Sequence, residues 1–94
     1  MPYRIILTTD IKKQLKELPG HVKPIARQEI ANLIDNPRPS RARELEGHPG
    51  HFRLHIAGKY RLVWRLEEEE KSVETEYIGP KTPDLYDMLG LARS

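Results

Sequence analysis

The sequence predicts a single α+β domain in which a strand and two helices precede an antiparallel sheet. Three observations support this fold class. Apolar and polar side chains alternate through residues 52–66 on both sides of Ala57-Gly58-Lys59, as in a β-hairpin with a glycine at its tip. Two earlier segments have apolar residues at helical spacing. The 94 residues are too few to divide their apolar surface between two cores, so residues 1–94 are expected to form one domain.

The first strand is expected at Tyr3–Leu7, a short β-rich run that should be well buried. Thr8-Thr9-Asp10 offers side-chain oxygens that can cap a first helix, and Pro19-Gly20 ends it. A second helix is expected to begin near His21–Pro24, because proline is tolerated in the first turn, and to stop at Asn36-Pro37. The two helices form a hairpin whose apolar stripes cover one face of the sheet. These stripes comprise Ile11, Leu15 and Leu18, and then Val22, Ile25, Ala26, Ile30, Leu33 and Ile34.

Further short strands are expected on both sides of the central hairpin. Ala42–Leu45 is the first of these, and residues 48–51 form a turn after it. The acidic run Glu67–Glu70 is interpreted as a solvated turn, since charge blocks usually face water. Ser72–Ile78 alternates and is broken by Gly79-Pro80. Its expected faces are Val73, Thr75 and Tyr77 on one side, and Glu74, Glu76 and Ile78 on the other.

A short C-terminal helix completes the predicted order. Thr82 is expected to be its N-cap, with Pro83 at the first helical position and Asp84 favoured by the helix dipole. Gly90 fits the position that ends a helix. The expected apolar side of this helix consists of Leu85, Met88 and Leu89.

The central hairpin predicts a sheet with one apolar and one cationic face. Alternate side chains of a strand point to opposite faces, so Phe52, Leu54 and Ile56 share one side. Tyr60, Leu62, Trp64 and Leu66 share a side of the next strand. If these are the same side of the sheet, the opposite side gathers Arg53, His55, Arg61 and Arg65.

The charge distribution indicates where a polyanion would bind. Residues 1–65 contain 13 Lys and Arg against 6 Asp and Glu, whereas residues 66–94 contain 3 against 8. The basic part is therefore the expected nucleic-acid surface. The absence of cysteine excludes disulfides and thiolate metal sites, and suits either a reducing cytosol or an unbridged secreted domain. No apolar run is long enough for a signal peptide or a membrane span, so a cytoplasmic location is expected.

Three segments resemble the RelE/ParE superfamily of toxin–antitoxin toxins. Residues 42–47 are similar to its Lys/Arg-x-Leu-x-Gly approach strand. Residues 52–64 are similar to its Tyr-Arg-x-Arg-x-Gly-Asp-Tyr-Arg-x-x-Tyr hairpin, which is the most specific of the three. Residues 78–86 are similar to the closing segment, a glycine followed by a tyrosine. The chain departs from the pattern at His55, where an arginine is usual, at one inserted residue near Ala57, and at Pro80-Lys81, where many ribonucleases have arginine or histidine.

The resemblance implies a microbial-ribonuclease-like fold and two possible activities. Members of the RelE branch cleave mRNA in the ribosome, and a cognate antitoxin wraps around the toxin to neutralise it. Members of the ParE branch inhibit DNA gyrase and cleave nothing. The resemblance thus implies as partners an antitoxin, and either mRNA with the ribosome or gyrase.

The residues themselves suit metal-free RNA cleavage. RNA carries its own nucleophile, the 2′-hydroxyl, so the protein must supply a base, an acid and positive charge at the phosphate. Arg61, which matches the hairpin arginine of the family, is the first candidate for the phosphate, and Arg53 is the second. His55 and Lys81 are the candidate acid and base. Tyr86 can transfer a proton or stack on a base.

Each of these residues also has a structural interpretation. Arg61 could form a salt bridge with Glu74 or Glu76, Arg53 and His55 could be ordinary surface residues, and Tyr86 could pack against the sheet rim. No cofactor is expected, and His48 and His51 lack ligands at metal-binding spacing. The expected contacts to ribosomal RNA backbone are basic side chains of the first helix and the linker: Lys12, Lys13, Lys16, Arg38, Arg41 and Arg43. Arg65 of the hairpin is expected to bind RNA as well.

The sequence supports a metal-independent endoribonuclease toxin best and leaves two alternatives open. One is a non-catalytic protein of the same fold, such as a gyrase inhibitor, which the departures at His55 and Pro80-Lys81 favour. It would induce the DNA damage response and leave mRNA intact. The other is a general RNA-binding module, which would bind with steep salt dependence and cleave nothing.

Overall fold

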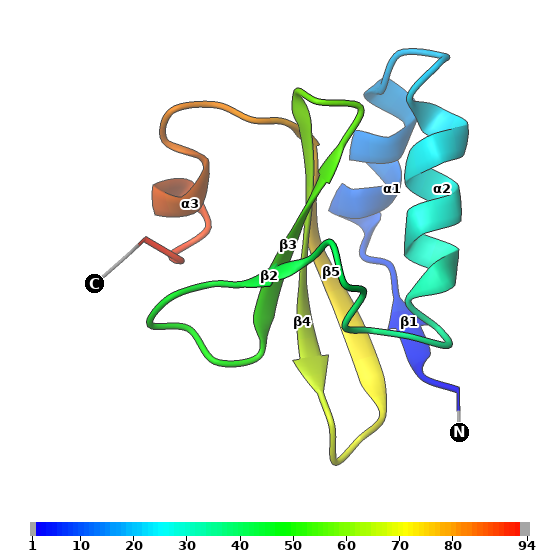
Figure 1. Ribbon diagram of the computed structural model, residues 1–94. Helices are drawn as coiled ribbons and strands as arrows, with labels where there is room; N and C mark the ends of the chain where they lie inside the picture. The colour runs from blue at the N-terminus through cyan, green and yellow to red at the C-terminus, as the bar shows by residue number, and fades with distance from the viewer. Residues whose placement is uncertain (1, 93–94) are drawn as a thin grey trace.

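Five strands form one mixed sheet in the computed structural model, which describes residues 2–92. The strand order is β1-β5-β4-β3-β2, and only β1 runs parallel to its neighbour (Figure 1). The α+β class and the element order agree with the prediction. The elements in chain order are β1 (Arg4–Ile6), α1 (Thr9–Glu17), α2 (Lys23–Asn32), β2 (Arg43–Glu44), β3 (His51–Ile56), β4 (Tyr60–Glu67), β5 (Ser72–Pro80) and α3 (Leu85–Met88).

The β3–β4 hairpin has the predicted register and turn. Ile56 pairs with Tyr60 across the tip, so the loop consists of Ala57, Gly58 and Lys59. Gly58 adopts φ 76°, a conformation that glycine reaches without strain. Because partners opposite each other in an antiparallel ladder lie on the same face, the pairing of residues 52 and 64 places Phe52 and Trp64 together. Their rings stack with centroids 5.7 Å apart.

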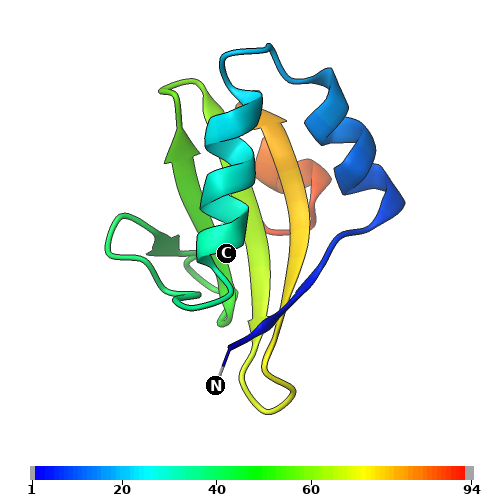
Figure 2. The same cartoon turned by 90° about the vertical axis from the view of Figure 1, so that its right-hand side faces the viewer.

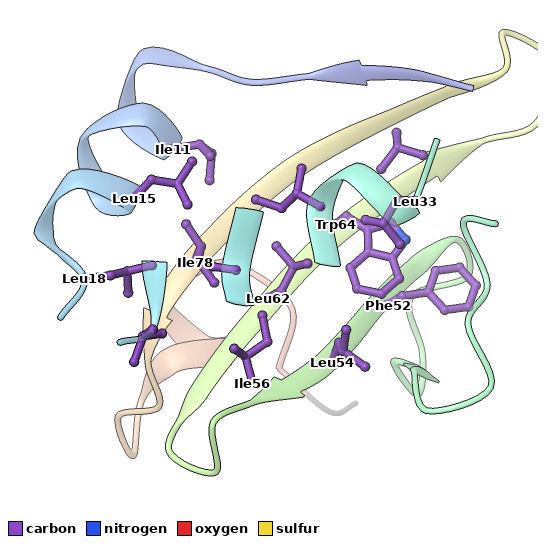
Figure 3. Close-up of a cluster of buried hydrophobic side chains, with 14 of the residues drawn as sticks. Ile11, Leu15, Leu18, Leu33, Phe52, Leu54, Ile56, Leu62, Trp64 and Ile78 are labelled. Carbon is purple, nitrogen blue, oxygen red and sulfur yellow. The ribbon is translucent and has the colours of Figure 1, made fainter. Parts of the chain in front are cut away.

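α1 and α2 cover one face of the sheet (Figures 1 and 2). Thr8 caps α1 as predicted, because its hydroxyl accepts a hydrogen bond from the Ile11 amide at 3.2 Å. Trp64 is fully buried beneath the helices, and its indole nitrogen donates to the Pro37 carbonyl. Figure 3 shows this core. Its main members are Ile11, Leu15, Leu18, Val22, Ala26, Ile30, Leu33, Phe52, Leu54, Ile56, Leu62, Trp64, Leu66, Val73 and Ile78.

Two predictions about the first helices and strand are wrong. The buried stripe of α2 is narrower than predicted, since Ile25 and Ile34 are 44% and 36% exposed, and the helix ends at Asn32. The first strand is not well buried, because Arg4 and Ile6 are exposed. β1 lies at the edge of the sheet and has a strand neighbour, β5, on one side only.

β5 departs from the predicted alternation at a β-bulge. Val63 pairs with Tyr77 but Trp64 pairs with Thr75, so Glu76 has no partner of its own in β4. The extra residue moves Ile78 to the core face with Val73, instead of the face of Glu74. The strand also continues through Gly79 to Pro80, which pairs with Tyr60, rather than stopping at Gly79-Pro80.

The C-terminal helix is shorter than predicted and lies on the opposite side of the sheet from α1 and α2 (Figure 1). It starts at Leu85, with Asp84 rather than Thr82 in the N-cap position, and the Thr82 hydroxyl donates to the Asp84 carboxylate at 3.0 Å. Met88 is 63% exposed and does not belong to a buried apolar side. Val63, Leu85 and Leu91 are buried outside the main core, so this second side of the sheet is partly apolar rather than wholly cationic.

The acidic run is only partly a solvated turn. Glu67 belongs to β4, and the turn begins at Glu68. Glu68 accepts hydrogen bonds from the Tyr3 hydroxyl at 2.6 Å and from Arg38 at 2.8 Å. The run thus ties the β4–β5 turn to the N-terminal strand and to the linker after α2. Within residues 2–92, no helix has the length and apolar character that crossing a membrane requires.

Candidate functional site

The sheet side opposite α1 and α2 carries the predicted basic residues. We call it the cationic face, and it comprises His51, Arg53 and His55 of β3 and Arg61 and Arg65 of β4. His55 is paired with Arg61, and His51 with Arg65, so these side chains share one face. This confirms the predicted gathering of Arg53, His55, Arg61 and Arg65, whereas His51 was wrongly expected in a turn and is the first residue of β3. The regular pairing of the hairpin is what brings them together.

Arg53 and His55 contact each other directly. One terminal nitrogen of Arg53 lies 2.6 Å from Nε2 of His55. A guanidinium can only donate, so Nε2 is the acceptor and the imidazole is neutral in this contact. Loss of hydration lowers the pKa of His55, and the positive charges of Arg61, Arg53 and Lys81 lower it further. His55 is therefore a neutral base at neutral pH, placed among three cations.

Arg61 is buried at the base of the hairpin loop. One of its terminal nitrogens donates to the carbonyls of Gly58 and Tyr60, each at 2.9 Å, and its buried Nε has no hydrogen-bond partner among the described residues. Within residues 2–92 it forms no salt bridge, so the structural interpretation through Glu74 or Glu76 does not hold. The guanidinium is held rigidly and remains uncompensated by a carboxylate.

Lys81 and Tyr86 lie at different ends of the cationic face. The Lys81 amide donates to the Lys59 carbonyl at 2.9 Å, which fixes the Lys81 backbone beside the hairpin tip and near His55. Tyr86 instead lines a cavity of about 310 Å³ with Arg43 and Arg53. Its hydroxyl is buried and has no hydrogen-bond partner in the described part of the chain. Arg43 and Arg53 thus line both the Tyr86 cavity and the cavity beside His55.

The predicted RNA contacts form three groups, of which the first and the third share Arg41. Arg41 and Arg43 line a cavity of about 280 Å³ with Arg53 and His55, and so extend the cationic face. Lys12, Lys13 and Lys16 are exposed on α1, on the other side of the sheet, and the structure does not bring them to the cationic face.

The third group is paired with carboxylates. Arg38 binds Glu68 at 2.8 Å, Arg41 binds Glu29, and Arg65 binds Glu67 at 2.9 Å and Glu74 at 3.1 Å. These carboxylates raise the pKa of Arg38 and Arg65. Exposed ion pairs of this kind contribute about 0–1 kcal/mol, so a phosphate can replace the carboxylate at small cost.

A histidine–carboxylate pair on the cationic face was not predicted. Nε2 of His51 lies 3.3 Å from Oε1 of Glu76. The bulge places Glu76 there, and a bulge leaves no signal in the alternation of a single strand. Among the described residues, no group of three or more His, Asp or Glu side chains is arranged to hold a metal ion.

Comparison with known proteins identifies the fold. No family model and no curated protein matches the chain. An E. coli RelE toxin mutant in the free state matches with a TM-score of 0.77 at 20% identity, over 93% of each chain. A chain of the RelBE2 toxin–antitoxin complex from Mycobacterium tuberculosis matches with a TM-score of 0.71 at 23% identity, over 86% of this chain and 100% of that one. The chain has the RelE toxin fold.

A third RelE-fold structure extends the comparison to archaea. A chain of the RelE–RelB complex from Pyrococcus horikoshii matches with a TM-score of 0.73 at 21% identity, over 88% of this chain and 99% of that one. The RelE fold therefore accounts for nearly the whole length of the chain.

Proposed function

We propose that this protein is a toxin of a toxin–antitoxin pair and cleaves mRNA, with the RNA 2′-hydroxyl as nucleophile. The observation that carries the proposal is the neutral imidazole of His55 beside Arg53, Arg61 and Lys81. A base that is neutral at physiological pH, surrounded by phosphate-binding cations, is what cleavage by internal transfer needs. The RelE fold supports the same activity by analogy.

The proposed reaction assigns one role to each residue. Nε2 of His55 removes the proton of the 2′-hydroxyl, and the 2′-oxygen attacks the adjacent phosphorus. Arg53, which occupies Nε2 in the free protein, turns to the phosphate and thereby releases the base. Arg61 and Arg53 stabilise the negative charge of the pentacoordinate phosphorus.

The leaving group then needs a proton. As the bond from phosphorus to the 5′-oxygen breaks, the Lys81 ammonium donates a proton to that oxygen. The products are a 2′,3′-cyclic phosphate and a 5′-hydroxyl. We assign Tyr86 to stacking on a neighbouring base, because it lines the cavity beside Arg53.

The proposed substrate is mRNA on the ribosome. Two separate basic surfaces support it: the cationic face with Arg41 and Arg43, and the lysines of α1 on the other side of the sheet. A protein that enters a cleft between RNA elements meets phosphates on both sides. The α1 lysines would then bind ribosomal RNA backbone while the cationic face holds mRNA.

Arg61→Ala tests the catalytic role. Removing one group that stabilises the developing charge lowers cleavage about 100-fold or more. The measurement is the mapping of mRNA ends after expression of wild type and variant, together with growth arrest. Arg4→Ala is the matched control, since Arg4 is exposed on β1, at the opposite edge of the sheet from β2.

The outcomes separate cleavage through Arg61 from gyrase inhibition. Equal cleavage by wild type and Arg61→Ala would remove Arg61 from the mechanism. Intact mRNA with an induced DNA damage response would favour gyrase inhibition. Because Arg61 is buried, Arg53→Ala and a circular dichroism spectrum of each variant distinguish lost chemistry from lost folding.

We also propose an antitoxin as protein partner. An apolar groove of about 260 Å³ lies between β1, α1 and α2, lined mainly by Ile5, Leu15, Ile30 and Ile34, with Arg27 beside them. An amphipathic segment with a carboxylate facing Arg27 would cover it. The RelE-fold structures from M. tuberculosis and P. horikoshii are themselves toxin–antitoxin complexes.

Co-expression with the product of an adjacent small gene tests the partner. Ile34→Asp places a charge in the groove and is expected to weaken binding at least about tenfold, or about 1.4 kcal/mol. Ile34 is already 36% exposed, so the fold tolerates the change. Unchanged affinity would show that the antitoxin binds elsewhere.

A further inference from the structure

A cavity lined by two tyrosines lies at the end of β5, and no role has been assigned to its residues so far. Its volume is about 390 Å³, and its lining is mainly apolar. Tyr60 and Tyr77 contribute two aromatic rings, and Pro19 and Pro80 lie beside them. Glu17 of α1 is the charged residue of the lining. An anion is disfavoured beside this carboxylate, whereas a flat uncharged ring matches the walls.

Tyr77 is held in place within this cavity. Its hydroxyl donates to the Pro80 carbonyl at 2.6 Å. A Cβ atom at Gly79 would lie 2.9 Å from the same hydroxyl, so the ring crosses the strand where glycine leaves room for it. Burial raises the pKa of Tyr77, and the hydroxyl therefore stays neutral. An aromatic side chain fixed in this way loses little conformational entropy when a ligand stacks on it.

The cavity lies between the end of α1 and the outer edge of β5. β1 pairs with β5 only at residues 72–74, so within the described chain the outer edge at Ile78–Pro80 is covered by no strand. The side chain of Gln14 in α1 accepts the Ile78 amide there instead, at 2.9 Å. Across the strand, Gly79 pairs with Arg61. Figure 2 shows α1 beside β5.

We propose that the cavity binds an unpaired base of single-stranded RNA whose phosphates run from the cationic face toward α1. This inference rests on the proposed RNA substrate. It adds a binding site that distinguishes an unstacked base from a stacked one. Stacking of one base on an aromatic side chain contributes about 1–3 kcal/mol, which corresponds to about 5-fold to 150-fold in affinity. Every base has a π-face, so the site selects an unstacked base at this position rather than one sequence.

Tyr77→Leu and Tyr77→Phe test the site in the full-length protein. The probe is a single-stranded RNA of about 12 nucleotides, labelled for fluorescence anisotropy. Tyr77→Leu keeps apolar volume but loses the aromatic ring, and is expected to weaken binding at least about fivefold. Tyr77→Phe loses only the hydrogen bond to Pro80 and is expected to restore most of the affinity. The RNA affinity of both variants is expected to fall with salt as steeply as that of wild type, since no phosphate contact is removed.

A second probe locates the base directly. The same RNA with 5-iodouridine at successive positions is irradiated, and the cross-linked peptide is identified by mass spectrometry. A cross-link at Tyr77 or Tyr60 is the expected result. The proposal is overturned if Tyr77→Leu binds RNA like wild type, if Tyr77→Phe falls as far as Tyr77→Leu, or if the cross-links map elsewhere.

The outcomes also separate this proposal from the proposed antitoxin site and from the nuclease proposal. If Tyr77→Leu weakens only the binding of the antitoxin, the cavity is a protein-binding site and the proposal fails. If the cross-link forms but wild-type protein cleaves no RNA, the nuclease proposal fails and the base site stands. If wild-type protein cleaves RNA but no cross-link forms and Tyr77→Leu loses no affinity, the base site fails and the nuclease proposal stands.

Discussion

At the scale of single residues, the surroundings of His55 and Arg61 decide what each can do. His55 is exposed and lies beside three positive charges, which disfavour its protonated form. Arg61 is 9% exposed and donates to two backbone carbonyls. His55 thus stays unprotonated at neutral pH, and Arg61 keeps a fixed positive charge next to it. Neither property depends on a carboxylate partner.

The His55 imidazole is expected to titrate below 6.5, its ordinary value. NMR titration of the folded protein measures this directly, and the same protein in denaturant gives the reference. Because the unfolded chain binds the proton first as pH falls, the stability contributed by neutral His55 is present above pH 6.5. It is lost as pH falls from 6.5 toward the folded pKa. Cleavage is expected to decline over the range in which folded His55 becomes protonated. A folded-state pKa at or above the reference would contradict this electrostatic account.

At the scale of elements, the sheet depends on a helix pair that covers only one of its faces. α2 contacts the core through a narrow stripe in which Ala26 and Ile30 are buried, whereas Ile25 of the same helix is 44% exposed. The two isoleucines therefore have the same chemistry and different surroundings. This contrast offers a matched test of how much the helix stripe stabilises the fold.

Ile30→Ala is expected to lower the free energy of unfolding by about 2–5 kcal/mol, because it leaves a cavity in the core. Ile25→Ala is expected to change it by less than about 1 kcal/mol, since the side chain is largely in water and alanine favours the helix. Urea unfolding followed by Trp64 fluorescence measures both. Equal losses of unfolding free energy in the two variants would show that Ile25 is as buried as Ile30, which contradicts this structure.

Features that depend on residues close together in the sequence were predicted correctly, whereas features that depend on distant segments were not. The hairpin at residues 52–66 and the Thr8 cap depend on neighbours along the chain, and both were predicted correctly. The bulge at Glu76 depends on how β5 pairs with β4, which alternation within one strand cannot reveal. The edge position of β1 likewise depends on the strand order of the whole sheet.

The candidate site shows the same division. The shared face of Arg53, His55 and Arg61 followed from period two within a hairpin. The pairing of Arg65 with Glu74 and the contact between His51 and Glu76 join β3 or β4 to β5, and they depend on the register. The position of Tyr86 depends on α3, whose start was misplaced because the Thr82 hydroxyl binds Asp84 instead of capping the helix.

At the scale of the whole molecule, the sheet separates two basic surfaces and the acidic part of the chain is used to join elements. Glu68 and Glu74 both lie in the acidic residues 66–94, and each binds an arginine from the basic residues 1–65. The first pair joins the linker to the β4–β5 turn, and the second joins β4 to β5. Arg53, Arg61 and Lys81 take part in no salt bridge among the described residues. Within the part of the chain that the structure describes, these three cations therefore have no carboxylate partner where the reaction is proposed to occur.

The most direct test of the central claim is cleavage of mRNA that lacks one 2′-hydroxyl. Translating ribosomes are programmed with two mRNAs that differ only by a single 2′-deoxynucleotide at the mapped cleavage position. If the cationic face activates the 2′-hydroxyl, the all-ribose mRNA yields a 2′,3′-cyclic phosphate and a 5′-hydroxyl, and the deoxy-substituted mRNA stays intact. Equal cleavage of both mRNAs at that position, or cleavage of neither, would contradict the account.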